Sequence, residues 1–184
     1  MARDTRTRLL DAALEQFVSR GVDAVAVTDL EHAAGLSAGS GSFYRHFRSK
    51  HDILAAVVAR EIDRAEARLE SVASGGDLTS QYADALDSLD AMRPLIGLLV
   101  REGTRLPGVD RIGQVLADGG ARIDAEQLRA RMAAGDIPDR DPDAVAAAVM
   151  MALVGYHLAE QFFGTPAGVD RGRFIAALAS LVGT

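Results

Sequence analysis

The sequence of 184 residues contains no cysteine. This absence excludes disulfide bonds, a thiolate nucleophile and a metal site built from thiolates. The N-terminus is charged and lacks the extended apolar segment of a secretory signal peptide. The most apolar run, residues 144–155, is too short to span a bilayer. We therefore expect a soluble protein of the cytoplasm that has no contact with a membrane.

The sequence also lacks the usual motifs of metal and nucleotide sites. Its histidines form neither an H-x-x-x-H nor an H-E-x-x-H pair, so we predict no metal site. Residues 39–42 are glycine-rich, but no lysine follows at the spacing of a phosphate-binding loop and no strand precedes them. We predict no catalytic residue and no cofactor.

Charged residues are unevenly distributed along the chain. Residues 1–60 contain eight Arg or Lys against seven Asp or Glu, whereas the remainder contains twelve against nineteen. A near-neutral first third followed by an acidic remainder is typical of a protein that contacts nucleic acid with one end only. Chance in a modestly charged chain explains the same distribution equally well.

Residues 28–52 have the layout of a helix-turn-helix. Thr28 opens a first short helix, with Glu31 three residues later at the spacing of a capping box. Gly35 ends this helix, because glycine adopts the left-handed cap conformation at little cost. A second short helix follows, and Ser49 opens a third.

The predicted second helix has one apolar face and several polar side chains. Phe43 and Phe47 are four residues apart, so they lie on one face and can be buried together. Tyr44, Arg45 and His46 then point largely elsewhere, with donors free for phosphates or base edges. Plausible N-caps for this helix are Ser37, Ser40 and Ser42.

At these residues the sequence resembles the TetR family of bacterial transcriptional regulators. The resemblance covers about the first third of the chain, in order and at near-family spacing. It is carried by residues 5–13, Phe17, residues 20–21, 27–30, 34–37, 44–47 and 49–50, and Leu54.

Two departures from the family pattern fall inside the motif. The segment from Gly35 to Tyr44 is two residues longer than the commonest family pattern, so which of Ala38 to Ser42 face the bases stays open. Ala26 stands where the family often places Ser or Thr. Since alanine cannot cap a helix, we expect Thr28 to take over that role.

The rest of the chain is predicted to be helical, with no alternating pattern typical of a strand. We predict an all-α fold of about nine helices, with an N-terminal three-helix DNA-binding head (residues 1–55) and a C-terminal helical ligand-binding and dimerisation body (residues 56–184). A long helix shared by head and body would act as a lever. The predicted helices are 4–20, 28–35, a short one that carries 43–47, 49–74, 78–93, 94–104, 109–134 with an interruption at 119–120, 142–163 and 170–182.

Helix 142–163 is apolar on more than one face, so it must bury more than one side. Its small residues permit the close approach of another helix. Paired across a two-fold axis with helix 170–182, it would form a four-helix homodimer interface, as in the resembled family. The alternative is that both helices pack only inside one monomer.

A ligand chamber is predicted inside the body, because methionine and aromatic side chains make adaptable apolar pockets. Glu102, His157 and Gln161 would be the polar residues that orient the ligand there. For any single residue, ordinary core packing is the alternative. The candidates are Tyr82, Met92, Leu98, Leu99, Glu102, Met132, Met150, His157, Gln161 and Phe162.

The resemblance implies a homodimeric regulator on a palindromic double-stranded DNA operator. It would act as a repressor until a small, largely apolar effector enters the body. Tyr44, His46 and Lys50 are predicted to contact phosphates. The candidate base contacts are Ser40, Ser42 and Arg45, with Thr28 from the preceding helix.

Two other functions remain as alternatives. The chain could be a regulator of the same fold without a small-molecule inducer, which answers to a protein partner or acts constitutively. A helical enzyme that retains the head as a scaffold is a more remote alternative, because no constellation of titratable groups supports it.

Overall fold

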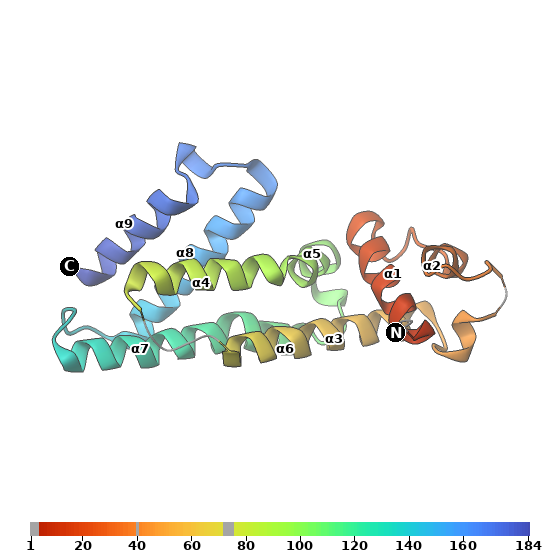
Figure 1. Cartoon of the computed structure of the whole chain (residues 1–184), viewed down its shortest axis with the longest axis horizontal. Helices are drawn as coiled ribbons and strands as arrows, with labels where there is room; N and C mark the ends of the chain where they lie inside the picture. The colour runs from red at the N-terminus through yellow and green to blue at the C-terminus, as the bar shows by residue number, and fades with distance from the viewer. Residues whose placement is uncertain (1–3, 40, 72–75) are drawn as a thin grey trace. The chain divides into compact units, whose positions relative to one another are not determined.

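The computed structural model describes residues 4–39, 41–71 and 76–184, and over these residues the protein is helical without a strand (Figure 1). The all-α prediction is thereby confirmed. Short 3-10 and π-helical segments join the α-helices of this described part. The α-helices are α1 (Thr5–Arg20), α2 (Val27–Ala33), α3 (Lys50–Ser71), α4 (Leu78–Ala91), α5 (Arg93–Glu102), α6 (Val109–Gly113), α7 (Gly120–Ala134), α8 (Pro142–Phe163) and α9 (Arg171–Gly183).

Aspartates cap the last two α-helices, α8 and α9. The Asp141 side chain accepts hydrogen bonds from the backbone N–H groups of Asp143 and Ala144, both at 3.1 Å, at the start of α8. Asp170 accepts one from Arg173 N at 2.9 Å at the start of α9. Each carboxylate satisfies N–H groups that have no partner inside the helix, which fixes where the helix begins.

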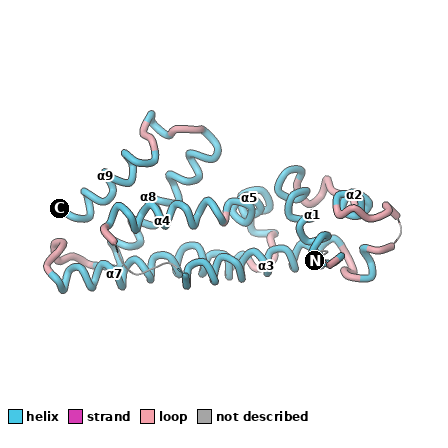
Figure 2. The backbone as a smooth tube through the Cα atoms, viewed as in Figure 1, coloured by secondary structure: helices cyan, strands magenta, loops and turns pink. Residues whose placement is uncertain are grey.

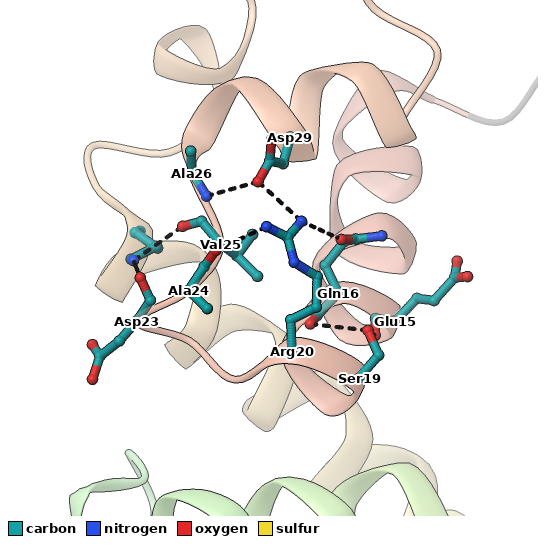
Figure 3. Close-up of polar contacts among 10 residues, drawn as sticks. Glu15, Gln16, Ser19, Arg20, Asp23, Ala24, Val25, Ala26 and Asp29 are labelled. Carbon is teal, nitrogen blue, oxygen red and sulfur yellow. Dashed lines mark hydrogen bonds and ion pairs between the residues drawn. The ribbon is translucent and has the colours of Figure 1, made fainter.

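Helix α2 begins one residue earlier than predicted, and Thr28 does not cap it. Ala26 is the N-cap residue, and the Asp29 side chain accepts a hydrogen bond from its backbone N–H at 3.2 Å (Figure 3). This hydrogen bond is the main cause that lowers the pKa of Asp29. Arg20 lies 3.0 Å from the same carboxylate. Because Asp29 supplies the cap from inside the helix, the alanine is tolerated.

The chain divides into two compact units, residues 1–64 with 92–112 (unit 1) and residues 65–91 with 113–184 (unit 2). By packing, α5 therefore groups with the N-terminal helices. The predicted boundary between residues 55 and 56 differs from this division by packing, and it stays a prediction.

Unit 1 has a core built from α1, α2, α3 and α5. Leu9, Phe17, Leu30 and Ile53 are completely buried in it. Helix α5 packs against α1, and two of its polar side chains hold the end of α1. Glu102 Oε1 accepts a hydrogen bond from Val22 N at 3.2 Å, and Arg101 Nη1 donates to Ser19 O at 3.3 Å.

Unit 2 is built around α8, which packs against α4 and α7, while α9 packs against α4. Leu128 and Leu153 are buried in this core. The guanidinium of Arg171 on α9 binds two carboxylates of α4, Asp87 at 2.6 Å and Asp90 at 2.7 Å. Unit 2 therefore combines an apolar core with an ionic link between α4 and α9.

Helix α8 is long and apolar enough to cross a membrane by length and composition alone, with a mean hydropathy of 1.4 over its best window. The expectation from the run 144–155 was too strict, because apolar residues continue to Phe163. Only 33% of that window is buried in the chain. Helices in the cores of soluble proteins meet the same criterion, and α8 packs against α4 and α7.

Candidate nucleic-acid interface

The predicted second helix of the helix-turn-helix is not an α-helix. Between α2 and α3 the described residues form a loop, pink in Figure 2, with one 3-10 turn, η1 (Phe43–Arg45). Gly39 and Gly41 have φ values of 75° and 71°. An α-helix requires consecutive residues at negative φ, so these two glycines delay and shorten the element.

The loop begins where glycine ends α2. Gly35 has φ 69°, its N–H donates to His32 O at 2.9 Å, and Leu36 N donates to Glu31 O at 2.8 Å. This pair of hydrogen bonds is the Schellman motif, which needs a left-handed residue at this position. The prediction that Gly35 ends the first helix is confirmed.

The Glu31 side chain holds the loop in place of a second helix. Although ionisable, this side chain is only 2% exposed. Its Oε2 accepts a hydrogen bond from Gly39 N at 2.7 Å, and its Oε1 accepts one from Phe43 N at 3.0 Å. The capping-box role predicted for Glu31 is therefore wrong, because its carboxylate turns into the loop.

The sequence predicted the wrong hydrogen-bond partner for Glu31, because a capping-box acid and an acid that binds the following loop occupy the same position in the sequence. An acid three residues into a helix indicates a cap, and only the folded loop shows which N–H groups reach it. The glycine-rich run after α2 was the available clue, since such a loop leaves backbone N–H groups without helical partners.

Two phenylalanines fix the 3-10 turn to the core and leave polar side chains outside. Phe43 is completely buried and Phe47 is 3% exposed, with ring centroids 5.8 Å apart. Tyr44 is 63% exposed, and Arg45 and His46 are exposed as well. The predicted division of this segment into a buried face and a polar face therefore holds, although the backbone is not α-helical.

Lys50 has a structural partner in unit 1. Its Nζ donates to Val25 O at 3.0 Å and to Asp23 O at 3.2 Å. These hydrogen bonds connect the start of α3 to the α1–α2 connection. The predicted phosphate contact would use the remaining ammonium proton, because an ammonium group carries three donors.

The other predicted DNA contacts lie at or beside the loop. Thr28 is exposed in the first turn of α2, and Ser42 is the N-cap residue of η1. Ser40 lies outside the described residues. Arg6 adds a positive charge, with its guanidinium 5.1 Å from the centroid of the Phe47 ring. From the sequence, Arg6 lies near the start of the first predicted helix and could reach a phosphate, and this stays a prediction.

The loop also contains the sequence Gly-Leu-Ser-Ala-Gly at residues 35–39, which matches the G-x-S-x-G pattern of hydrolases. That pattern works where a strand turns sharply into a helix and exposes the serine. Here it starts at the end of α2 and leads into a loop. The match therefore has none of the structural context that catalysis needs.

The predicted ligand residues are divided between the two units. Met92, Leu98, Leu99 and Glu102 belong to unit 1, where Glu102 already accepts a hydrogen bond from Val22 N. The remainder belong to unit 2. Within unit 2, Nδ1 of the buried His157 lies 3.3 Å from Asp90 Oδ1. The members of the unit 2 set are Tyr82, Met132, Met150, His157, Gln161 and Phe162.

Comparisons with known proteins agree with this architecture. The sequence profile described as "Bacterial regulatory proteins, tetR family" matches residues 9–57. The chain is 30% identical over 112 residues to the HTH-type transcriptional regulator UidR of Escherichia coli K12, covering 59% of this chain and 56% of that protein. It is 32% identical over 111 residues to the HTH-type transcriptional repressor KstR2 of Rhodococcus jostii RHA1, covering 58% and 53%.

The chain thus spans about half the length of these curated relatives. A similar solved structure covers more of it. The regulatory protein TetR from Rhodobacter sphaeroides aligns over 96% of both chains, with a TM-score of 0.66 and 25% identity. These named relatives are regulatory proteins rather than enzymes.

The variant Glu31→Gln tests the role of this carboxylate. A glutamine keeps one acceptor oxygen, but its NH₂ group would face one of the two backbone N–H groups. We expect a loss of about 2 kcal/mol in the free energy of unfolding, measured by chemical denaturation. The amides of Gly39 and Phe43 should also exchange hydrogen faster. Glu15→Gln, at an exposed position of α1, is the matched control. Unchanged stability and protection in Glu31→Gln would contradict the assignment.

Proposed function

We propose that this chain, which belongs to the TetR family of bacterial regulatory proteins, binds double-stranded DNA and regulates transcription. The observation that carries the proposal is the segment from Tyr44 to His46. It is exposed and rich in hydrogen-bond donors, and the buried side chains of Phe43 and Phe47 on either side hold it against the core. DNA lies in the cytoplasm of a bacterium, so we also propose a cytoplasmic location.

The exposed donors divide by chemistry into two roles. A phenol and an imidazole, from Tyr44 and His46, suit phosphate oxygens, which position a protein without reading sequence. The Arg45 guanidinium suits guanine, because it can donate two hydrogen bonds to O6 and N7. Ser40, Ser42 and Thr28 are further candidates for base contacts, and Lys50 for a phosphate contact.

An exposed apolar stripe on α8 supports a homodimer. Ala144, Ala148, Met151 and Gly155 recur every three or four residues and are all exposed, with Met151 at 58%. On α9, Leu181 is 70% exposed. Burial inside one monomer does not account for these residues. A two-fold interface through α8 and α9 would cover them and would match the two half-sites of a palindromic operator.

Repression relieved by a small molecule is the regulatory mode we propose. The name of KstR2 describes a repressor, and α3 is one continuous helix whose residues 50–64 belong to unit 1 and 65–71 to unit 2. A change in unit 2 that moves α3 would thus reach unit 1. A regulator without a small-molecule inducer is the alternative, and it is favoured if no small molecule changes the DNA affinity.

The direct test is fluorescence anisotropy of the purified protein with DNA from the region upstream of its own gene. A scrambled duplex is the control, and the salt concentration is varied. The affinity for the specific duplex should exceed that for the control by a factor of about 10³ or more. If no genomic fragment is selected over random DNA, the chain is not a sequence-specific regulator.

The variant Arg45→Ala separates base contact from phosphate contact. If Arg45 donates to a guanine, the variant should lose about 1–3 kcal/mol of discrimination at one operator position. Affinities for operators substituted at each position, measured with both proteins, provide the readout. A uniform loss at every position with a smaller salt slope would assign Arg45 to phosphate instead.

Lys50→Ala should change both DNA affinity and stability. Losing a phosphate contact should reduce the salt slope by about one unit. Losing the hydrogen bonds to Val25 O and Asp23 O should also cost about 1–2 kcal/mol in stability. Salt titration and chemical denaturation measure the two effects separately. A lower stability with an unchanged salt slope would leave Lys50 only its structural role.

Met151→Glu tests the dimer interface. A charge buried at the centre of an apolar interface without a partner is costly, so the variant should sediment as a monomer at concentrations where the parent protein is a dimer. Its operator affinity should fall accordingly. Ala130→Glu, which adds the same charge at an exposed position of α7, should leave the dimer intact. A Met151→Glu dimer as tight as the parent would place the interface elsewhere.

A further inference from the structure

Unit 2 contains a group of buried polar atoms that the proposed dimer and DNA contacts do not use. Tyr82 on α4 is 1% exposed and Asp124 on α7 is 7% exposed. Within the described part of the chain, the Tyr82 hydroxyl, Asp124 Oδ2 and Gln81 Oε1 are buried without a hydrogen-bond partner. Folded proteins seldom leave such atoms unpaired, so each unpaired atom requires an explanation.

These atoms belong to one neighbourhood. Gln81 Nε2 donates to the other carboxylate oxygen of Asp124, Oδ1, which links α4 to α7. The charge of Asp124 also contributes to the raised pKa of Tyr82, after the larger effect of burial. The nearby cation Arg131 donates to Gly76 O at 2.6 Å. The Asp124 carboxylate therefore has a neutral amide as its direct partner.

The three unpaired atoms have a common chemical complement. A carboxylate oxygen and an amide oxygen accept hydrogen bonds, and a phenol oxygen can accept one too. A primary ammonium group has three donors and one positive charge, which would balance the buried carboxylate. An apolar ligand would leave all three atoms unpaired, and an anionic ligand would add repulsion. One turn further along the two helices, Leu86 and Leu128 are buried and provide apolar surroundings.

We propose that Gln81, Tyr82 and Asp124 form the polar end of a binding site for a small molecule that carries a protonated amine. As an effector site this rests on the proposed function, and it replaces the largely apolar effector expected from the sequence. Of the residues predicted there, Tyr82 belongs to the site. Asp124 and Gln81 were missed, because each pairs with a residue more than forty positions away.

The first test measures thermal unfolding of the full chain at pH 7.5 with two matched probes, 2-phenylethylamine and 2-phenylethanol. Both have the same ring and chain, but only the amine is charged. The amine should raise Tm by about 3–5 °C at roughly ten times its dissociation constant, and the alcohol should not. If the alcohol raises Tm as much as the amine, or if neither does, the amine site is wrong.

Variants on α7 assign the effect to Asp124. Asp124→Asn should abolish the shift caused by the amine. Glu126→Gln removes the same charge from an exposed position of the same helix, and it should keep the shift. A shift that persists in Asp124→Asn would overturn the proposal, as would an equal loss in both variants.

A second test needs no ligand and uses the pH dependence of Tm. Burial raises the pKa of Asp124 to about 6, against the lowering effects of Gln81 and Arg131. The carboxyl of the unfolded chain titrates near pH 4. Between these two pH values the carboxyl of Asp124 is ionised in the unfolded state but still protonated in the folded state. The stability of the parent protein therefore falls as the pH rises from about 4 to about 6. The variant Asp124→Asn should therefore gain Tm relative to the parent as the pH rises from 4 to 7.

Opposite results would assign Asp124 to ordinary structure. If Asp124→Asn lowers Tm equally at every pH, the carboxylate is a satisfied structural group that bonds to Gln81 and to buried water, and the site is overturned. Glu126→Gln, in contrast, should show no such pH-dependent gain.

DNA binding separates the failure of this site from the failure of the proposed function. An amine that raises Tm and weakens operator binding supports both. An amine that raises Tm without changing operator affinity supports the site and contradicts its role as an effector site. Normal operator binding with no response of Tm to the amine contradicts the site alone, and absence of specific DNA binding contradicts the proposed function.

Discussion

The buried Glu31 carboxylate is the interaction on which the DNA-binding segment depends. A loop with two glycines at positive φ cannot continue a helix through those positions, so the N–H groups of Gly39 and Phe43 need other acceptors. Glu31 provides two, one for Gly39 and one for Phe43. Hydrogen bonds to an ionised acceptor are stronger than neutral ones. A single side chain thus provides the acceptors for two backbone N–H groups.

This arrangement determines which side chains the loop presents. Because Phe43 is fixed by both its backbone N–H and its buried ring, the next three residues have little freedom to turn inward. Tyr44, Arg45 and His46 are therefore held at the surface by a short 3-10 turn. A 3-10 turn has fewer backbone hydrogen bonds of its own than an α-helix. Losing the hydrogen bonds to Glu31 would therefore loosen the turn. The long spacing between Gly35 and Tyr44 is compatible with a defined surface for this reason.

Among its described residues, unit 2 combines exposed apolar surface with buried polar atoms that lack a hydrogen-bond partner. Helix α8 has more apolar surface than one chain covers, as the exposed Met151 shows. Helices α4 and α9 are connected by Arg171 with two carboxylates, whereas α4 and α7 share a carboxylate that has only an amide partner. The buried apolar side chains and the paired charges of unit 2 contribute to the stability of the folded chain. The exposed stripe and the unpaired atoms instead suggest partners, a second copy of the chain and a ligand.

Local signals in the sequence determined most of the helices of this protein. Helix α8 begins after Asp141 and ends before Gly164, as the sequence predicts. Such ends can be predicted because helix capping depends only on neighbours within one turn. The spacing of Phe43 and Phe47 was enough to predict that both are buried. The tertiary structure decided the partners of Glu31, Lys50, Glu102 and Asp124. Each of these side chains binds a group between 8 and 80 residues away, and no local pattern specifies which distant donor or acceptor the fold will bring within reach.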